Sequence, residues 1–312
     1  MIENVGPFRL APWFSPRPWG RMDLSPWYGD TGKNEPVGEA WLTGPQSVIE
    51  TGSLKGSTLQ EAVSRFGQAL VGEEGAEFPL LVKLLFPNDK LSVQVHPDDA
   101  QAQAMGQPRG KTECWYVLDA AGGSTIALGL KQGATPELVR KAIADGTLED
   151  LVQQVPVQAG DMIFVDAGTV HAIGPGVVLL ETQQTCDITF RMYDYGRPRE
   201  LHVDKAIEVM RTQTQAGKIA PRQMMDGFTR LIEQKYFTVD RYDVGSGDAA
   251  TMDGGVPTCL AGLRGTAQVE CPGAEPVELR PGQAVVVPVS AQSVVVRSED
   301  GVSFVRCFAP MS

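Results

Sequence analysis

Four polar side chains between residues 94 and 113 have the types and the spacing that metal binding or acid–base catalysis requires. Gln94 and His96 are two residues apart, and Lys111 and Glu113 repeat that spacing. Residues two apart in a strand project from the same face. Two neighbouring strands would therefore bring an amide, an imidazole, an ammonium and a carboxylate to one point. We expect a metal centre or a catalytic pocket there, because both need groups that are held rigidly.

A second histidine extends this group. His171 follows a turn signature at residues 166–169. Imidazole nitrogen and carboxylate oxygen are common ligands of zinc and similar ions, and the amide oxygen of Gln94 is a weaker one. The four side chains Gln94, His96, Glu113 and His171 together carry one negative charge. A divalent ion bound to them would therefore keep a net positive charge and could polarise a carbonyl. Spacing alone leaves open whether His171 is a ligand or a buried core residue.

Two basic residues lie within strand patterns. Lys83 is the single interruption of an apolar run over residues 78–86. A lysine in a strand buried on both faces loses solvation, so we expect Lys83 to point into a polar pocket rather than to a sheet edge. Residues 187–193 alternate polar and apolar, which puts Arg191 on the polar face. Its pattern alone favours a solvated surface arginine.

The elements that must hold these groups are mainly strands. The 312 residues include 34 Gly and 22 Pro, a composition that favours many short strands joined by turns. The expected strands that concern the site cover residues 78–86, 91–96, 112–118, 162–165, 177–180 and 187–193.

Helical patterns interrupt the strands at three places. Ser57 or Thr58 as the N-cap, followed by Glu61, predicts a capped helix over residues 58–71. A Thr-Pro-Glu sequence at 135–137 begins a helical insertion around 134–154. Residues 200–217 are expected to form a helical connector.

The N-terminal residues 1–45 are rich in Pro, Gly and Trp, which predicts an irregular arm pinned by aromatic side chains. Packing is the simplest role for Trp19 and Trp41, since large aromatics dominate core energetics.

Two domains are expected, one over 1–217 and one over 218–312. The turn-then-strand pattern at 160–165 recurs at 282–287. Eleven residues after the first glycine of each copy stands His171 in the first copy and Ser293 in the second. The second domain therefore lacks the metal ligand.

Charge and cysteine content restrict the partners. A formal net charge of −11 argues against nucleic acid or an anionic membrane, whereas a local group of cations can still bind a small anion. Five scattered cysteines indicate reduced core residues. Because no leader pattern or long apolar stretch occurs, we expect a soluble, cytoplasmic protein, monomeric or weakly homo-oligomeric.

Several blocks resemble the signature sequences of the type I mannose-6-phosphate isomerases in their short bacterial form, which are zinc enzymes of the cupin superfamily. These blocks are residues 90–98, 110–113, 160–161 and 167–172, with further similarity at 18–20, 37–41 and 145–148. The resemblance implies a mainly β fold, with a cupin (jelly-roll) β-barrel, a small helical insertion and a second, degenerate cupin-like β domain. It also implies one Zn²⁺ per chain, with other divalent metals as alternatives.

The implied reaction is the metal-dependent interconversion of mannose 6-phosphate and fructose 6-phosphate through a cis-enediol. The resemblance implies that the metal ligands are Gln94, His96, Glu113 and His171. It implies that the catalytic residues are Arg191, Lys111 and Glu181, and that the substrate-binding residues are Lys83, Lys90 and Ser92. The group that carries the proton is left open among Glu181, a metal-bound water and a basic residue.

Three departures from the family pattern bear on substrate fit rather than on metal binding. Arg21 stands where a second glycine is common, residues 42–44 replace an acidic residue and a serine, and Asp166 stands where cupins often have proline.

Two other functions stay open. A cupin oxygenase could hold iron with two histidines and a carboxylate, and a sugar-phosphate sensor could use the same scaffold without catalysis. Gln94 and the basic residues fit a phosphorylated polyol better than an aromatic substrate. Intact ligands together with Lys111 and Arg191 favour an enzyme over a sensor.

Overall fold

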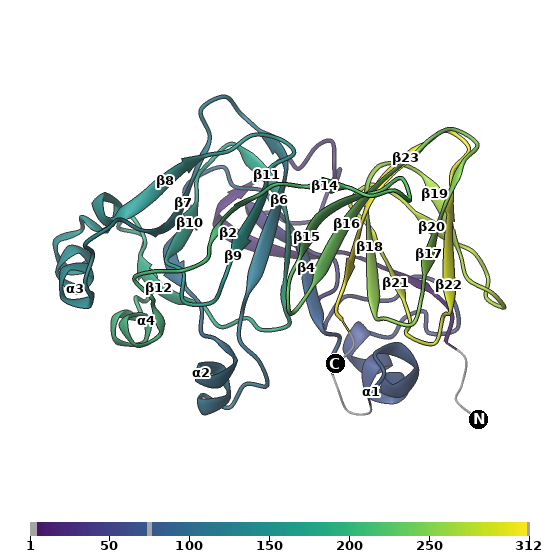
Figure 1. Cartoon of the computed structure of the whole chain (residues 1–312), viewed down its shortest axis with the longest axis horizontal. Helices are drawn as coiled ribbons and strands as arrows, with labels where there is room; N and C mark the ends of the chain where they lie inside the picture. Colours follow the sequence, from purple (N-terminus) through teal and green to yellow (C-terminus); the bar gives the residue numbers. More distant parts are fainter. Residues whose placement is uncertain (1–4, 74–76, 311–312) are drawn as a thin grey trace.

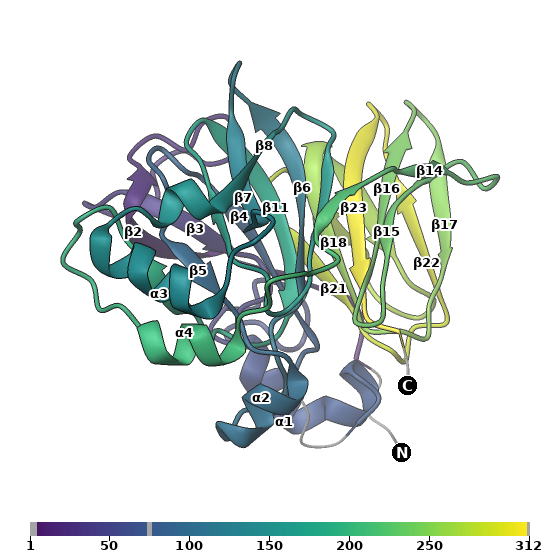
Figure 2. The same ribbon diagram turned by 60° about the vertical axis from the view of Figure 1, so that its left-hand side comes forward.

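Strands provide most of the secondary structure in this computed structural model, which describes residues 5–73 and 77–310. Figure 1 shows two β lobes side by side, with α3 and α4 at the far end of the first lobe and α1 and α2 along one edge. Figure 2 shows the same two lobes after a turn of the view. The prediction of a mainly β fold is confirmed.

The first lobe consists of two antiparallel sheets. The seven-stranded sheet has the order β13 (Gly217–Ile219), β9 (Met162–Val165), β6 (Glu113–Ala120), β11 (Val177–Gln184), β4 (Leu80–Leu85), β3 (Val37–Trp41) and β2 (Trp13–Arg21). The five-stranded sheet has the order β12 (Phe190–Tyr193), β5 (Val93–Val95), β10 (His171–Ile173), β7 (Thr125–Leu130) and β8 (Val152–Pro156).

The space between these two sheets is apolar at one end and polar at the other. Trp115 and Leu179 of the larger sheet pack there with Ile126 of the smaller one. Side chains alternate along each strand, so residues at even steps from these also face inward, among them Glu113 and Glu181. The alternation therefore puts carboxylates at one end of a hydrophobic interior.

The second lobe also has two antiparallel sheets. Its seven-stranded sheet has the order β1 (Phe8–Leu10), β21 (Ala284–Val287), β18 (Thr258–Gly265), β23 (Val302–Phe308), β16 (Thr238–Val244), β15 (Thr229–Glu233) and β14 (Arg222–Gln223). Its four-stranded sheet has the order β17 (Ala249–Asp253), β22 (Ser293–Arg297), β19 (Ala267–Glu270) and β20 (Val277–Leu279). Because β1 pairs with β21, the N-terminal residues complete the second lobe. The proposed domain boundary at residue 217 stays a prediction.

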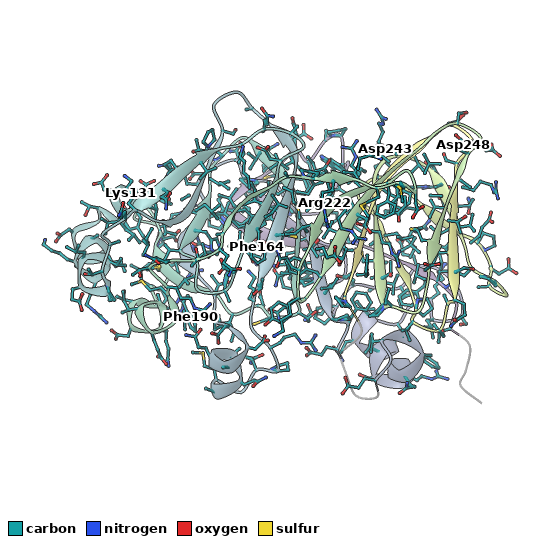
Figure 3. All side chains as sticks on the ribbon, in the orientation of Figure 1. Lys131, Phe164, Phe190, Arg222, Asp243 and Asp248 are labelled. Carbon is teal, nitrogen blue, oxygen red and sulfur yellow. The ribbon has the colours of Figure 1, made fainter. Side chains whose placement is uncertain are left out.

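One large core joins the lobes. It contains Leu84 and Phe164 from the first seven-stranded sheet together with Val239, Val286 and Val305 from the second. Each of these sheets thus buries one face inside its own lobe and the other face against its neighbour. Figure 3 shows the side chains that fill both lobes.

The helices mostly follow the sequence expectation. Helix α1 (Leu59–Leu70) begins at Thr58 with the capping box that was predicted. The insertion contains α3 (Pro136–Asp145) and a 3-10 helix, η1 (Leu148–Leu151). The connector is helical only over α4 (Val203–Val209), which is shorter than expected. Helix α2 (Asp99–Ala104) was not expected, because six residues are too few to give a periodic pattern.

The prediction of an irregular arm was wrong, because β1, β2 and β3 lie within residues 1–45. Strand β2 contains Pro16 and Pro18 and lies at the edge of its sheet, where a proline costs no ladder hydrogen bond. The packing role of Trp19 and Trp41 is confirmed, since they are 3% and 6% exposed.

All five cysteines are free and buried, as expected of core residues. Within residues 5–73 and 77–310, every helix is too short or too polar to cross a membrane.

Candidate metal centre and active site

Two histidines and a glutamate form a buried cluster that could hold a metal ion. The ligand atoms of His96, Glu113 and His171 all lie within 4.8 Å of one another. Nε2 of His171 is 3.4 Å from Glu113 Oε1, and Nε2 of His96 is 3.7 Å from Glu113 Oε2. Each residue is 1% exposed. The three groups therefore converge on one point inside the first lobe.

Strand register explains how this cluster forms. In the five-stranded sheet, Gln94 of β5 lies opposite His171 of β10 on one side and Arg191 of β12 on the other. His96 follows directly after the end of β5, and Glu113 begins β6 in the facing sheet. The site is therefore assembled from both sheets of the lobe. Gln94 is half-buried, and its side-chain nitrogen is 3.3 Å from His171 Nε2.

Backbone carbonyls fix the tautomers of the two histidines. Nδ1 of His96 lies 2.8 Å from the oxygen of Ile188, and Nδ1 of His171 lies 2.9 Å from the oxygen of Thr169. A carbonyl oxygen only accepts, so each Nδ1 must donate and each Nε2 carries the lone pair. Both Nε2 atoms are the ones that face Glu113.

Burial also keeps these imidazoles neutral. It lowers the pKa of His171 to about 4. Burial and the charge of Lys111 hold the pKa of His96 well below its usual value. Neutral imidazole is the form that binds a metal. Burial also raises the pKa of Glu113 to about 7, although the charge of Lys111 opposes this shift.

The donors present fit a divalent metal. Glu113 Oε2 is buried and lies 3.2 Å from the ammonium of Lys111. A buried carboxylate is costly unless nearby charges stabilise it, and a metal cation would add to the stabilisation that Lys111 provides. Two imidazole nitrogens and one carboxylate are also a common ligand set of catalytic zinc sites.

Two lysines, Lys111 and Lys83, lie beside the cluster. Lys111 Nζ is 3.2 Å from His96 Nε2. Burial acts to lower the pKa of Lys111, but the carboxylates of Glu113 and Glu181 outweigh it and raise that pKa. Lys83 Nζ lies 3.1 Å from Glu181 Oε2 and 2.7 Å from Gln183 Oε1. Lys83 therefore faces a polar pocket, as its strand pattern predicts.

Glu181 is a buried carboxylate that stays ionised. Burial acts to raise its pKa, but the charges of Lys83 and Lys111 outweigh burial and lower that pKa. Its Oε1 accepts a hydrogen bond from Nε1 of Trp115 at 3.2 Å. Glu181 is thus held on both oxygens and negatively charged at neutral pH.

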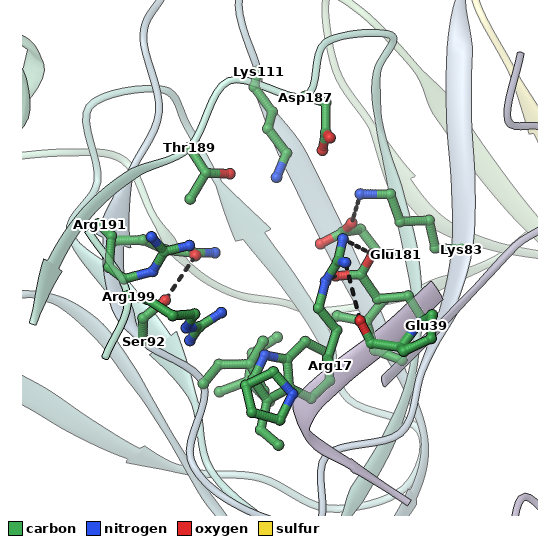
Figure 4. A pocket seen from close by; sticks show the side chains of 17 residues that line it. Arg17, Glu39, Lys83, Ser92, Lys111, Glu181, Asp187, Thr189, Arg191 and Arg199 are labelled. Carbon is green, nitrogen blue, oxygen red and sulfur yellow. Dashed lines mark hydrogen bonds and ion pairs between the residues drawn. The ribbon is translucent and has the colours of Figure 1, made fainter. Parts of the chain in front are cut away.

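A pocket of about 520 Å³ opens beside these groups (Figure 4). Five basic and three acidic side chains line it, so the pocket is cationic although the chain is acidic. The charged residues of the lining are Arg17, Lys83, Lys111, Arg191, Arg199, Glu39, Glu181 and Asp187.

Most of the expected site residues meet here. The pocket is lined by Lys83, Ser92, Gln94, Lys111, Glu181 and Arg191. Lys90 is not brought to this pocket, because its ammonium lies at the surface, 2.7 Å from Glu149. Sequence reasoning missed Arg17 and Glu39. Glu39 belongs to one block that resembles the family, and Arg17 directly precedes another.

The segment that carries Lys111 is fixed on both sides. The amide of Gly110 donates to Asp99 Oδ1 at 2.9 Å, and the amide of Thr112 donates to Gln184 Oε1 at 3.0 Å. Gln184 Nε2 also donates to Asp99 Oδ1 at 2.9 Å. Two side chains that bond each other therefore hold the backbone around Lys111.

The second lobe supports this arrangement. Tyr236, between β15 and β16, donates its hydroxyl hydrogen to Asp99 Oδ2 at 2.6 Å. A chain of hydrogen bonds thus runs from the second lobe through Asp99 to the backbone beside Lys111.

Known proteins similar to this chain are isomerases. The family model "Phosphomannose isomerase type I, catalytic domain" matches residues 8–128. The mannose-6-phosphate isomerase of Streptococcus mutans is 35% identical over 287 residues, which is 88% of this chain and 90% of that protein. Mannose-6-phosphate isomerase ManA of Bacillus subtilis is 38% identical over 258 residues, covering 78% of this chain and 81% of that protein.

Solved structures show the same likeness. The mannose 6-phosphate isomerase of Bacillus subtilis superposes with a TM-score of 0.85 at 30% identity, over 97% of this chain and 99% of that one. A zinc-bound mannose 6-phosphate isomerase has a TM-score of 0.78 at 16% identity, over 98% and 100% of the two chains, which shows a shared fold.

Proposed function

This chain belongs to the type I phosphomannose isomerase family, and we propose that it interconverts mannose 6-phosphate and fructose 6-phosphate with the help of a bound divalent metal. The observation that carries this proposal is the buried cluster of His96, Glu113 and His171 beside a cation-lined pocket. A phosphorylated sugar is an anion, and the pocket offers cations in a chain that is otherwise acidic.

The residues proposed to hold the metal are Gln94, His96, Glu113 and His171, and the metal proposed is one Zn²⁺ per chain. These residues support zinc, because zinc commonly binds the nitrogen of imidazole and the oxygen of carboxylate. When bound, the metal supplies positive charge that polarises the oxygens of the substrate.

Lys111 and Arg191 are proposed to stabilise the enediolate. Isomerisation removes a proton from C2 and returns it at C1, and negative charge develops on the sugar oxygen between these events. Fixed cations next to that oxygen lower the barrier. Lys111 suits this role because its pKa is raised by Glu113 and Glu181 against the effect of burial, so it remains an ammonium.

Glu181 is proposed to carry the proton between C2 and C1. It is ionised at neutral pH, the state that can accept a proton. Lys83 holds one of its oxygens and Trp115 the other, which restricts its orientation. Lys83 and Ser92 line the same pocket and are proposed to bind substrate. Lys90 stays a predicted substrate contact from the family resemblance alone.

A coupled assay for fructose 6-phosphate tests the proposal directly. The purified protein is assayed with mannose 6-phosphate as isolated, after chelation and after reloading with Zn²⁺, with its metal content measured each time. We expect activity to disappear on chelation and to return with zinc. A flat assay with metal-replete protein would contradict the isomerase and favour a sugar-phosphate sensor.

Two variants separate the catalytic roles from metal binding. Arg191→Ala should abolish turnover while metal content stays intact, because Arg191 is not a ligand. Glu181→Gln should lower kcat about 100-fold or more, since general acid–base groups contribute about that much. Arg140→Ala is the control, because Arg140 forms an exposed ion pair with Asp204 away from the pocket. Loss of metal in Arg191→Ala would make Arg191 structural.

A further inference from the structure

Three arginines point into the pocket from different elements. Arg17 belongs to β2, Arg191 to β12, and Arg199 follows β12. Figure 4 shows Arg17 on the opposite side of the pocket from Arg191 and Arg199. Guanidinium groups repel one another, so their convergence in an acidic chain indicates a site for an anion.

Arg17 is held in place with donors to spare. Its Nε donates to Glu39 Oε1 at 3.2 Å, and its Nη2 donates to Glu39 Oε2 at 3.0 Å. Nη1 donates to the carbonyl oxygen of Pro16 at 3.2 Å. A guanidinium carries five N–H bonds, so two remain for a ligand. Its side chain is 31% exposed and lines the pocket.

The neighbouring strand is shaped to hold this arginine. A Cβ on Gly38 would lie 2.6 Å from Cβ and 2.7 Å from Cγ of Arg17, so only glycine leaves room for the side chain. Glu39 itself accepts a hydrogen bond from Nε1 of Trp41 at 2.7 Å. Strand β3 therefore provides both the space and the fixed carboxylate that orient Arg17.

The opposite side of the pocket has unmet hydrogen-bonding capacity. Nε of Arg191 is buried and has no partner among the described residues. Burial first, and then the charge of Arg199, lower the pKa of Arg191; Asp194 opposes this shift, and Arg17 adds to it. An anion between these arginines would relieve their repulsion.

We propose that Arg17 is a specificity residue that binds the phosphate group of the substrate, opposite Arg199. The planar fork of arginine matches two phosphate oxygens. This inference rests on the proposed function for the identity of the substrate, but its anion site can be tested without turnover.

The test compares Arg17→Gln with Arg9→Gln. Arg9 makes the same kind of pair with Glu50, at 2.8 Å, but lies outside the pocket. Arg17→Gln should raise KM for mannose 6-phosphate about 10- to 100-fold, the cost of losing a charged hydrogen bond, with kcat within about twofold. It should weaken binding of inorganic phosphate, measured by calorimetry, by a similar factor. Arg9→Gln should change neither quantity.

Arg17→Lys keeps a cation next to Glu39 and tests the site even if Arg17→Gln fails to fold. Its KM and phosphate affinity should lie between those of the wild type and Arg17→Gln, because lysine lacks the fork. Unchanged phosphate affinity, or a lower kcat with unchanged KM, would overturn the proposal. If the wild type does not isomerise the sugar, the proposed function fails, while the phosphate titration still decides the role of Arg17.

Discussion

At the scale of single residues, Glu113 differs from His171 in its protonation state before a metal binds. The metal-free protein keeps His171 neutral down to about pH 4, whereas burial raises the pKa of Glu113 to about 7. Below pH 7 a metal must therefore displace a proton from Glu113 and none from His171. Sites of this type commonly lose affinity when histidines protonate, and here the carboxylate should titrate first.

We predict that metal affinity falls about tenfold per pH unit as pH decreases below about 7, because the protonated form of Glu113 competes with the metal. Affinity should level off above pH 7, where the carboxylate is already ionised. Competition with a chromophoric chelator from pH 5 to pH 8 measures this. In Glu113→Gln the dependence between pH 5 and pH 7 should vanish, at lower overall affinity. A wild-type slope that persists in this variant would assign the proton to another group.

Gln94 is the weakest of the four proposed ligands, because an amide carries no charge. Its half-buried side chain approaches His171, at 3.3 Å, whereas the carboxylate of Glu113 faces both histidines. Gln94→Ala should lower zinc affinity about tenfold and Glu113→Ala by much more, measured with the same chelator. Full zinc affinity in Gln94→Ala would remove Gln94 from the ligand set.

At the scale of elements, the sequence indicates which residues of one strand share a face, but it does not indicate which strands pair with each other. The spacing of Gln94 and His96, and of Lys111 and Glu113, predicted that each pair acts together. The row of Arg191, Gln94 and His171 across three strands depends on register between distant segments, which no local pattern contains.

The helices and the N-terminal arm show the same division. A capping box is a local signal, so the start of α1 was predicted to within one residue, with Ser57 or Thr58 as the N-cap. Proline residues argue against a strand unless that strand lies at the edge of its sheet, and the edge position of β2 is not visible in the sequence. Arg17 was missed for this reason, since its role depends on Gly38 and Glu39 of the neighbouring strand.

The turn before β6 depends on a glycine. A Cβ on Gly110 would lie 2.4 Å from the carbonyl carbon of Asp98, which belongs to the backbone and must shift to make room. Gly110→Ala should therefore displace Lys111, lower kcat and cost about 1–3 kcal/mol of stability. Steady-state kinetics and urea unfolding measure both effects. Gly122→Ala is the control, because its Cβ meets nothing within 4 Å, and equal kinetics in both variants would contradict this role.

At the scale of the whole molecule, the second lobe supports the site, although it contains none of the four residues proposed to hold the metal. It contacts the first lobe through a shared core and through polar contacts such as Arg241 Nη1 to the hydroxyl of Tyr116, at 2.6 Å. One of these contacts, from Tyr236 to Asp99, leads to the segment that carries Lys111.

Tyr236→Phe should therefore lower kcat about two- to fivefold and cost about 1 kcal/mol of stability, the usual value of one hydrogen bond. Tyr116→Phe removes another hydroxyl between the lobes, and should cost similar stability without changing kcat. Steady-state kinetics and unfolding by urea measure these effects. Identical kcat values in the two variants would show that the second lobe contributes stability alone.

The pairing of β1 with β21 sets a delay during synthesis. Strand β1 ends at Leu10 and its partner begins at Ala284, so the ribosome must add more than 270 residues before the pair can form. At about 5–20 residues per second, the first strand waits roughly 15 to 55 s without its neighbour. Its length of three residues and the charge of Arg9 at its centre limit mispairing with other edges in that interval.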